Sequence, residues 1–208
     1  GLVASGDVTA LLTNPAAGLT VGSSYTMYVR SVCSGSDSSA WASLAFTVPS
    51  PNDTCATAVT INCGDTLAGS TLGATNENMA VCGISGVTVQ NTPGVWYKFT
   101  GDGRDVTIST CSSASGDTRL AVYTGACNGT MTCVTGNDDN GACTVSTTSS
   151  EVLFSTINGT EYYVLVYNYT SSSSKTFEIK MTCVVPCTPA TANDECATAT
   201  ALTVGTPL

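Results

Sequence analysis

Apolar and polar residues alternate in short runs along most of the chain, at the two-residue period of a β-strand. In the stretch GVWYKFT, from Gly94 to Thr100, Val95 and Tyr97 share one face of an extended strand while Lys98 lies on the other. Turn-forming residues separate such runs about every 8–12 residues, which predicts an all-β fold, an antiparallel β-sandwich. The predicted strands are 8–12, 25–33, 44–48, 56–62, 95–100, 106–111, 120–124, 131–134, 151–157, 162–167 and 177–183.

Two proline-rich stretches divide the chain. Pro49 and Pro51 follow the predicted strand 44–48, and Pro186 and Pro189 follow the last predicted strand. Because proline interrupts strand pairing and stiffens a linker, the predicted domains are residues 1–48, 49–186 and 187–208. The sequence NDTCATA at 52–58 recurs as NDECATA at 193–199, which indicates that residues 193–208 open a second copy of the middle domain.

Charge and cysteine content narrow the class of protein. The 208 residues carry 6 Lys+Arg against 15 Asp+Glu, a net charge of −9, which repels nucleic acid and anionic lipid. No apolar run is long enough to span a membrane. Eleven cysteines without a histidine indicate disulfides in an oxidising, extracellular compartment, at the cell surface.

Several positions match acceptor patterns for glycans. Four asparagines stand in Asn-x-Ser/Thr sequons, which are N-glycosylation acceptors in secreted proteins. Asp65-Thr66-Leu67 resembles the acidic-Thr-aliphatic pattern that secreted Bacteroidota proteins use for O-linked sugar. The predicted glycosylation sites are Asn52, Asn128, Asn158, Asn168 and Thr66.

The N-terminal part carries a first family resemblance. The phrase GLTVGSSYTMYVRSVCSGSDSSAWASLAFTV, residues 18–48, resembles the second half of a fibronectin type III domain. Leu19 and Tyr25 occupy the places of the Leu and the corner Tyr that precede its penultimate strand. The first half of such a domain is missing, and a half sandwich leaves an apolar sheet face in water. We therefore expect more of the same polypeptide, or a neighbouring chain, to cover that face.

The middle part carries a second resemblance. Its motifs NDTC, GVWYKFTG, GDTRLAVYTGAC, NDD, EYYVLVY and FEIKMTC occur in an order that resembles the bacterial pre-peptidase C-terminal domain, a jelly roll, over about residues 52–185. The resemblance implies local disulfides Cys55–Cys63 and Cys127–Cys133. We add Cys111–Cys143 as a third predicted pair and Cys82–Cys183 as a further candidate.

Acidic residues in predicted turns suggest one cofactor. Asp117, Asp138 and Asp139 match the most recurrent acids of the resembled family, and calcium prefers several oxygen ligands from loops. The alternative is that such carboxylates accept hydrogen bonds from nearby backbone amides and only stabilise turns. The predicted ligands of a structural calcium ion are Asp138, Asp139, Asn52 and Asp53.

Aromatic residues and the absence of histidine bear on activity. Trp96, Tyr97, Tyr162, Tyr163, Tyr167 and Tyr169 could form a sugar-stacking platform or fill the sandwich core. Without histidine, a Ser-His-Asp or Cys-His catalytic arrangement is excluded, and the glutamates stand in no recognisable acid/base motif. The sequence therefore predicts a protein that is not an enzyme.

These features together predict a non-catalytic structural or adhesive segment of an extracellular, repeat-built protein, a subunit of a cell-surface fibril or filament. Its expected partners are copies of itself, adjacent domains of the same long chain, and glycans. The alternative is an accessory, carbohydrate-binding module of a secreted peptidase or glycoside hydrolase, which the usual context of the resembled domain implies.

Overall fold

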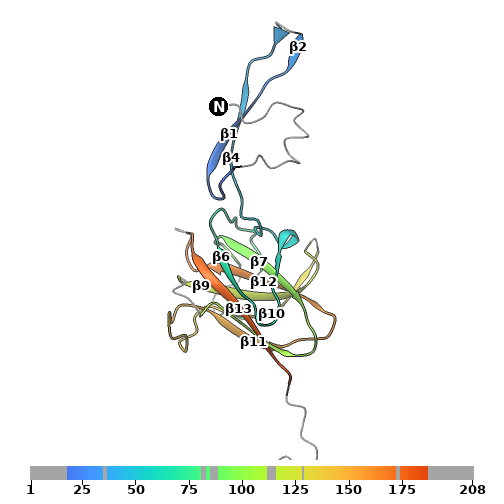
Figure 1. Ribbon diagram of the computed structural model, residues 1–208, viewed down its shortest axis with the longest axis vertical. Helices are drawn as coiled ribbons and strands as arrows, with labels where there is room; N and C mark the ends of the chain where they lie inside the picture. Colours follow the sequence, from blue (N-terminus) through green and yellow to red (C-terminus); the bar gives the residue numbers. More distant parts are fainter. Residues whose placement is uncertain are drawn as a thin grey trace, which may run out of the picture.

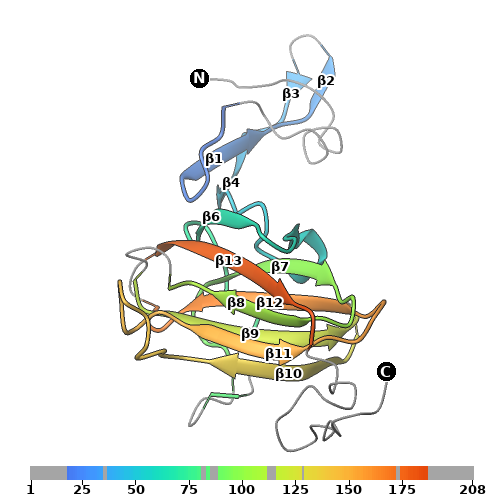
Figure 2. The same cartoon turned by 60° about the horizontal axis from the view of Figure 1, so that its bottom comes forward.

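The computed structural model describes residues 18–34, 37–80, 83–84, 89–111, 116–127, 129–171 and 174–186. These residues form a β-sandwich with a hairpin that projects from one end (Figure 1; Figure 2 shows the same arrangement from another side). No α-helix occurs in this part of the chain. The predicted strand at 8–12 and the second copy at 193–208 lie outside the described residues.

The projecting hairpin pairs β1 (Ser24–Val29) with β4 (Ala42–Thr47) in antiparallel register. Beyond it, β2 (Val32–Ser34) pairs with β3 (Asp37–Ser38). The predicted strand 25–33 is therefore broken. At the break the Ser31 amide donates to the Ser39 hydroxyl at 3.0 Å, and a serine side chain that binds the backbone in this way competes with ladder hydrogen bonds.

The sandwich consists of a five-stranded sheet in the order β10-β9-β12-β7-β5 and a four-stranded sheet in the order β11-β8-β13-β6. All neighbours are antiparallel except β5 and β7, which run parallel. The strands are β5 (Val59–Thr60), β6 (Thr66–Ser70), β7 (Gly94–Thr100), β8 (Asp105–Ser109), β9 (Thr118–Gly125), β10 (Met131–Asn137), β11 (Glu151–Ser155), β12 (Glu161–Asn168) and β13 (Thr176–Val184).

Two elements differ from the sequence prediction. Residues 56–62 do not form one strand: a 3₁₀ turn at Cys55–Thr57 precedes the short β5. The strand β6 was not predicted, because its sequence TLAGS lacks a run of β-branched or aromatic residues. The other described strands of the sandwich match their predictions except at their ends.

The main core lies between the two sheets. The register places Val164 of β12 between Tyr97 of β7 and Val122 of β9, so these side chains share the inner face. Side chains of β8 and β13, including Ile108 and Ile179, complete the core from the four-stranded sheet. Burying each aliphatic side chain of this kind is worth about 1.5–3 kcal/mol.

A second apolar layer covers the outer face of the five-stranded sheet. Trp96, Leu165 and Tyr123 lie there, fully or almost fully buried, and the residues that pack against them include Cys55, Ala58, Met79 and Ile84. Trp96 anchors this layer: its Nε1 donates to Glu77 Oε2 at 2.5 Å, and its amide donates to the Asn52 carbonyl at 2.8 Å. The strand β7 is therefore buried on both faces, which simple alternation did not predict.

Three disulfides connect distant parts of the sandwich: Cys55–Cys127, Cys63–Cys183 and Cys111–Cys143. The last is the third predicted pairing, which is confirmed. The local pairings Cys55–Cys63 and Cys127–Cys133, and the candidate Cys82–Cys183, are wrong. The reason is spatial: Cys55 belongs to the layer over the five-stranded sheet, whereas Cys63 lies at the crossover toward β6 and meets β13. Cys133 is also disulfide-bonded.

Candidate functional site

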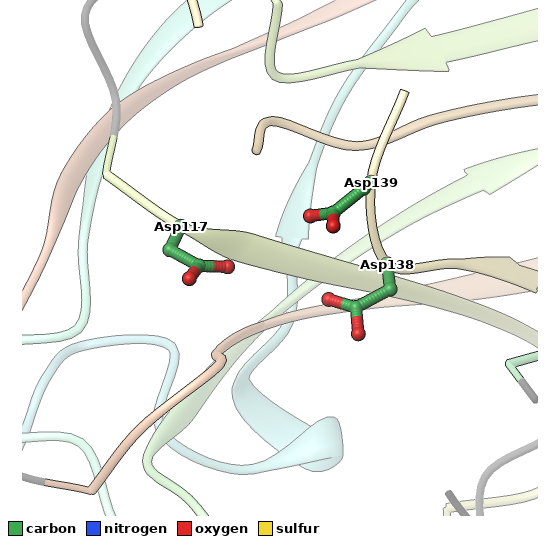
Figure 3. A group of neighbouring side chains, drawn as sticks. All are labelled: Asp117, Asp138 and Asp139. Carbon is green, nitrogen blue, oxygen red and sulfur yellow. The ribbon is translucent and has the colours of Figure 1, made fainter. Parts of the chain in front are cut away.

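Three carboxylates gather where β9 begins and β10 ends. Asp117 directly precedes β9, and Asp138 and Asp139 directly follow β10. Because β9 and β10 are antiparallel neighbours, these two strand ends lie side by side. One oxygen of each carboxylate lies within 4.8 Å of the others, and Figure 3 shows the three side chains pointing toward one another.

The neighbouring loop 140–150 holds this acidic cluster (Asp117, Asp138 and Asp139) in place. The Ser150 hydroxyl contacts the carbonyls of both Thr118 and Asp138 and shares its one hydrogen between them, which links the start of β9 to the end of β10. The Asn140 amide donates to the Ser149 carbonyl at 2.8 Å, which continues the link into the loop. These hydrogen bonds therefore hold the backbone that carries the carboxylates in a fixed position.

One arginine partly neutralises the acidic cluster. Arg119 Nη2 lies 2.9 Å from Asp138 Oδ2, and the guanidinium stacks over the Tyr169 ring at 4.4 Å from its centroid. Among the described residues, Asp117 forms no such ion pair, although the charges of Arg119 and Lys175 act on it. Loss of hydration, followed by repulsion from Asp139 and Asp138, raises the pKa of Asp117 above its ordinary value.

Unpaired polar atoms concentrate around the same cluster. Of the six buried side-chain nitrogen and oxygen atoms without a hydrogen-bond partner in the described part of the chain, four belong to Asp117, Arg119, Asp138 and Tyr167. Buried polar groups are nearly always paired, so such a concentration requires an explanation.

The sequence identified only part of this constellation. Asp117 was recognised as a recurrent acid but not placed among the ligands, and Arg119 and Tyr167 were missed. Asp117 and Arg119 are two residues apart in GDTRL, the spacing that places side chains on one face of a strand, and this was an available signal. No sequence signal pointed to Tyr167, because only the register of β12 with β9 places it opposite Arg119.

Asn52 and Asp53 do not join the acidic cluster, so their prediction as calcium ligands is wrong. Asn52 Nδ2 donates to the Trp96 carbonyl at 3.0 Å, and its Oδ1 accepts from Ser50. Both oxygens of Asp53 accept hydrogen bonds from Thr75, at 2.5 and 3.0 Å. The NDTC motif therefore holds the covering layer against β7, with Cys55 contributing its disulfide.

Burial also decides among the predicted glycan acceptors. Asn52 is 8% exposed with its amide nitrogen engaged, and Asn168 is 0% exposed, so neither side chain can accept a glycan in the folded protein. Asn158 lies in an exposed turn, and Thr66 is exposed on the edge strand β6, so both stay predictions. Asn128 lies outside the described residues.

The predicted aromatic platform for sugars does not form. Five of the six residues are buried in one of the two apolar layers, and the sixth, Tyr169, is covered on one face by Arg119. The interpretation of these side chains as core residues is the one that the structure supports.

A shallow cavity of about 450 Å³ lies beside the Cys63–Cys183 disulfide. Its floor includes Phe99, and its rim includes Lys98 and the ion pair of Arg104 with Asp102, whose closest atoms are 2.5 Å apart. Arg104 Nη2 also contacts Cys63 Sγ at 3.2 Å. The rim carries charges of both signs.

The architecture thus defines a disulfide-bonded β-sandwich module of the kind found in secreted proteins. The sequence matches no family model and no curated protein at a significant level. Among the described residues, no helix has the length and apolar character needed to cross a membrane.

Two solved structures resemble the fold. One is the pre-peptidase C-terminal domain of collagenase from Bacillus anthracis, with 17% sequence identity and a TM-score of 0.37; the match covers 60% of this chain and 93% of that one. The other is PliG from Aeromonas hydrophila, a periplasmic inhibitor of g-type lysozyme, with 14% identity and a TM-score of 0.40; it covers 61% and 96% of the two chains.

Proposed function

We propose that this chain is a non-catalytic structural segment of an extracellular, repeat-built protein, and that it serves in a cell-surface fibril or filament. The observation that carries the proposal is the apolar face of the β1–β4 hairpin, on which the β4 side chains are exposed and the β1 side chains are half-buried. An adjacent domain of the same long chain, or a second copy, covers this face in the assembled protein.

The register of the hairpin separates two unlike faces. Tyr25 pairs with Phe46, Met27 with Leu44, and Val29 with Ala42, so one face is entirely apolar. The other face presents mainly Ser and Thr. Leu44 is 58% exposed and Phe46 is 38% exposed, although both belong to the apolar face. Apolar area of this kind gains about 25 cal/mol per Å² when another surface covers it.

The base of the hairpin supports a role in transmitting load. The Gly22 amide donates to the Val48 carbonyl at 2.9 Å, and the Ser50 amide donates to the Gly73 carbonyl at 3.2 Å. The first bond closes the base of the hairpin itself, and the second joins that base to the turn that follows β6. A pulling force on the hairpin would therefore reach the sandwich through this second bond as well as through the covalent chain.

Two further features support an extracellular structural role. The disulfides close segments of 72, 120 and 32 residues, so they limit how far each module can extend under load. The Thr20 amide donates to the Tyr25 hydroxyl at 3.1 Å, which is the kind of contact a corner Tyr makes in fibronectin-like sandwiches. This contact supports the expectation that the hairpin belongs to a two-layer domain.

Neighbouring substitutions on opposite faces of β4 test the proposal. Negative-stain microscopy of the secreted full-length product should show filaments for the wild type and for Ser43→Lys, and no filaments for Leu44→Lys. Both positions are exposed, so both substitutions are tolerated by the hairpin itself. A wild-type product that stays a single globular particle, or filaments that survive Leu44→Lys, would show the proposal to be wrong.

A further inference from the structure

The acidic cluster contains oxygens that the protein itself does not use. Arg119 occupies Asp138 Oδ2 at 2.9 Å, while Asp138 Oδ1 is buried and has no partner. Asp117 Oδ1 is likewise buried and without a partner. Asp117, Asp138 and Asp139 each place one carboxylate oxygen within 4.8 Å of an oxygen of the other two (Figure 3).

A fully buried side chain outside the cluster, that of Tyr167, lies beside Arg119 on the neighbouring strand. Tyr167 is 0% exposed, and its hydroxyl has no hydrogen-bond partner. Its strand register sets it directly opposite Arg119 on the same face of the sheet, and its hydroxyl interacts electrostatically with both Arg119 and Asp138. A phenol that is buried without a partner is costly, and a water molecule held at the cluster would satisfy it.

We propose that Asp117, Asp138 and Asp139 bind a calcium ion. Calcium takes 6–8 oxygen ligands from flexible carboxylates and water, which suits three carboxylates and a hydration shell that reaches the Tyr167 hydroxyl. A divalent cation also relieves the repulsion among the three carboxylates, which Arg119 and Lys175 offset only in part. Magnesium is less suited, because it demands near-ideal octahedral geometry.

The ion would stabilise the edge strand β10 of the sandwich. β10 is an edge strand of the five-stranded sheet, paired only with β9. Calcium at the shared end of these two strands would hold the edge in register. The proposal is independent of the assembly role, because the hairpin contributes no ligand.

The test is thermal unfolding and calorimetric titration of the chelator-treated 208-residue chain with calcium chloride. We expect one ion per chain, with a dissociation constant of about 10⁻⁴–10⁻³ M, as in extracellular calcium modules. At 10 mM calcium the melting temperature should rise by about 5 °C. Asp117→Asn and Asp139→Asn should weaken binding at least about tenfold, and both keep the Arg119–Asp138 ion pair.

The control is Asp102→Asn, which should leave calcium binding unchanged. Asp102 follows the C-terminal end of β7, whereas the strand pairing places the acidic cluster toward the N-terminal end of β7. Three results would overturn the proposal. These are the absence of saturable calcium binding, an equal rise in melting temperature with magnesium or with sodium at matched ionic strength, and an equal loss of binding in Asp102→Asn.

Discussion

Strands of the hairpin and of the sandwich show the same alternation along the sequence, but the side chains are exposed in β4 of the hairpin and buried in β7 of the sandwich. In β7, side chains on both faces are buried, because a second sheet covers one face and the layer that includes Cys55, Met79 and Ile84 covers the other. In β4, every residue is exposed, although Leu44 and Phe46 alternate with small residues as a core strand would. The comparison teaches that alternation specifies which face needs covering and says nothing about what covers it.

Covalent links sharpen the contrast. Both apolar layers of the sandwich are tied by disulfides that join residues far apart in sequence, such as Cys55–Cys127 across 72 residues. The hairpin strands β1 and β4 contain no cysteine. The sandwich is therefore stabilised by its apolar layers and by disulfides, whereas the hairpin depends on main-chain pairing and on its contacts at the base.

The largest expected effect is the loss of a disulfide. The double substitution Cys55→Ser with Cys127→Ser should lower the free energy of unfolding of the sandwich by about 4 kcal/mol, because a loop of this length is no longer closed in the unfolded chain. Chemical denaturation under non-reducing conditions measures this. A loss below about 1 kcal/mol would mean that the covering layer does not depend on the disulfide.

A matched pair of leucine truncations tests the comparison directly. Leu165→Ala removes a 0% exposed side chain beside Trp96 and should cost about 3 kcal/mol of unfolding free energy. Leu44→Ala removes a 58% exposed side chain and should change the stability of the isolated chain by less than about 0.5 kcal/mol. Similar costs at the two positions would mean that the hairpin face is already covered.

The junction between the two regions is the next target. Gly73 has a φ of +73°, and a Cβ there would stand 2.7 Å from the Val48 carbonyl oxygen and 2.9 Å from the Gly22 nitrogen. Gly73→Ala should therefore cost about 1–2 kcal/mol and loosen the hairpin base. Hydrogen exchange should show faster exchange of the Gly22 and Ser50 amides, with β12 unchanged. Unchanged exchange at the base would contradict the tight junction.

The smallest expected effect concerns Glu77 in the covering layer. Partial burial raises the pKa of Glu77, and the hydrogen bond from Trp96 only partly offsets this. For an acid with a raised folded pKa, the stability penalty is absent below the unfolded value near 4.5, grows as the pH rises toward the folded pKa, and is constant above it.

Glu77→Gln keeps an acceptor for the Trp96 nitrogen but removes the charge. We expect it to be more stable than the wild type by a few tenths of a kcal/mol at pH 7, an advantage that disappears near pH 4. Urea denaturation across this range measures the difference. A variant that is less stable than the wild type at pH 7 would show that the ionised carboxylate stabilises the layer.

The sequence was a good guide wherever local pattern decides. Alternation in GVWYKFT and EYYVLVY placed β7 and β12, and the charge and cysteine content agree with a disulfide-bonded sandwich. It failed where contacts are long-range. The local pairing of Cys55 with Cys63 is wrong because nearness in sequence does not imply nearness in space, and Asn52 and Asp53 form hydrogen bonds across layers instead of binding an ion.

By itself, then, the sequence determined the two-residue period of the strands, the apolar face of each, and a cysteine content suited to an oxidising compartment. Only the tertiary structure decided which cysteines meet, which sequons are buried, and that Asp117 joins Asp138 and Asp139 in one cluster. The physical reason is that period and polarity are properties of neighbouring residues. Pairing and burial depend instead on which strands become neighbours, and that is fixed by packing across the whole sandwich.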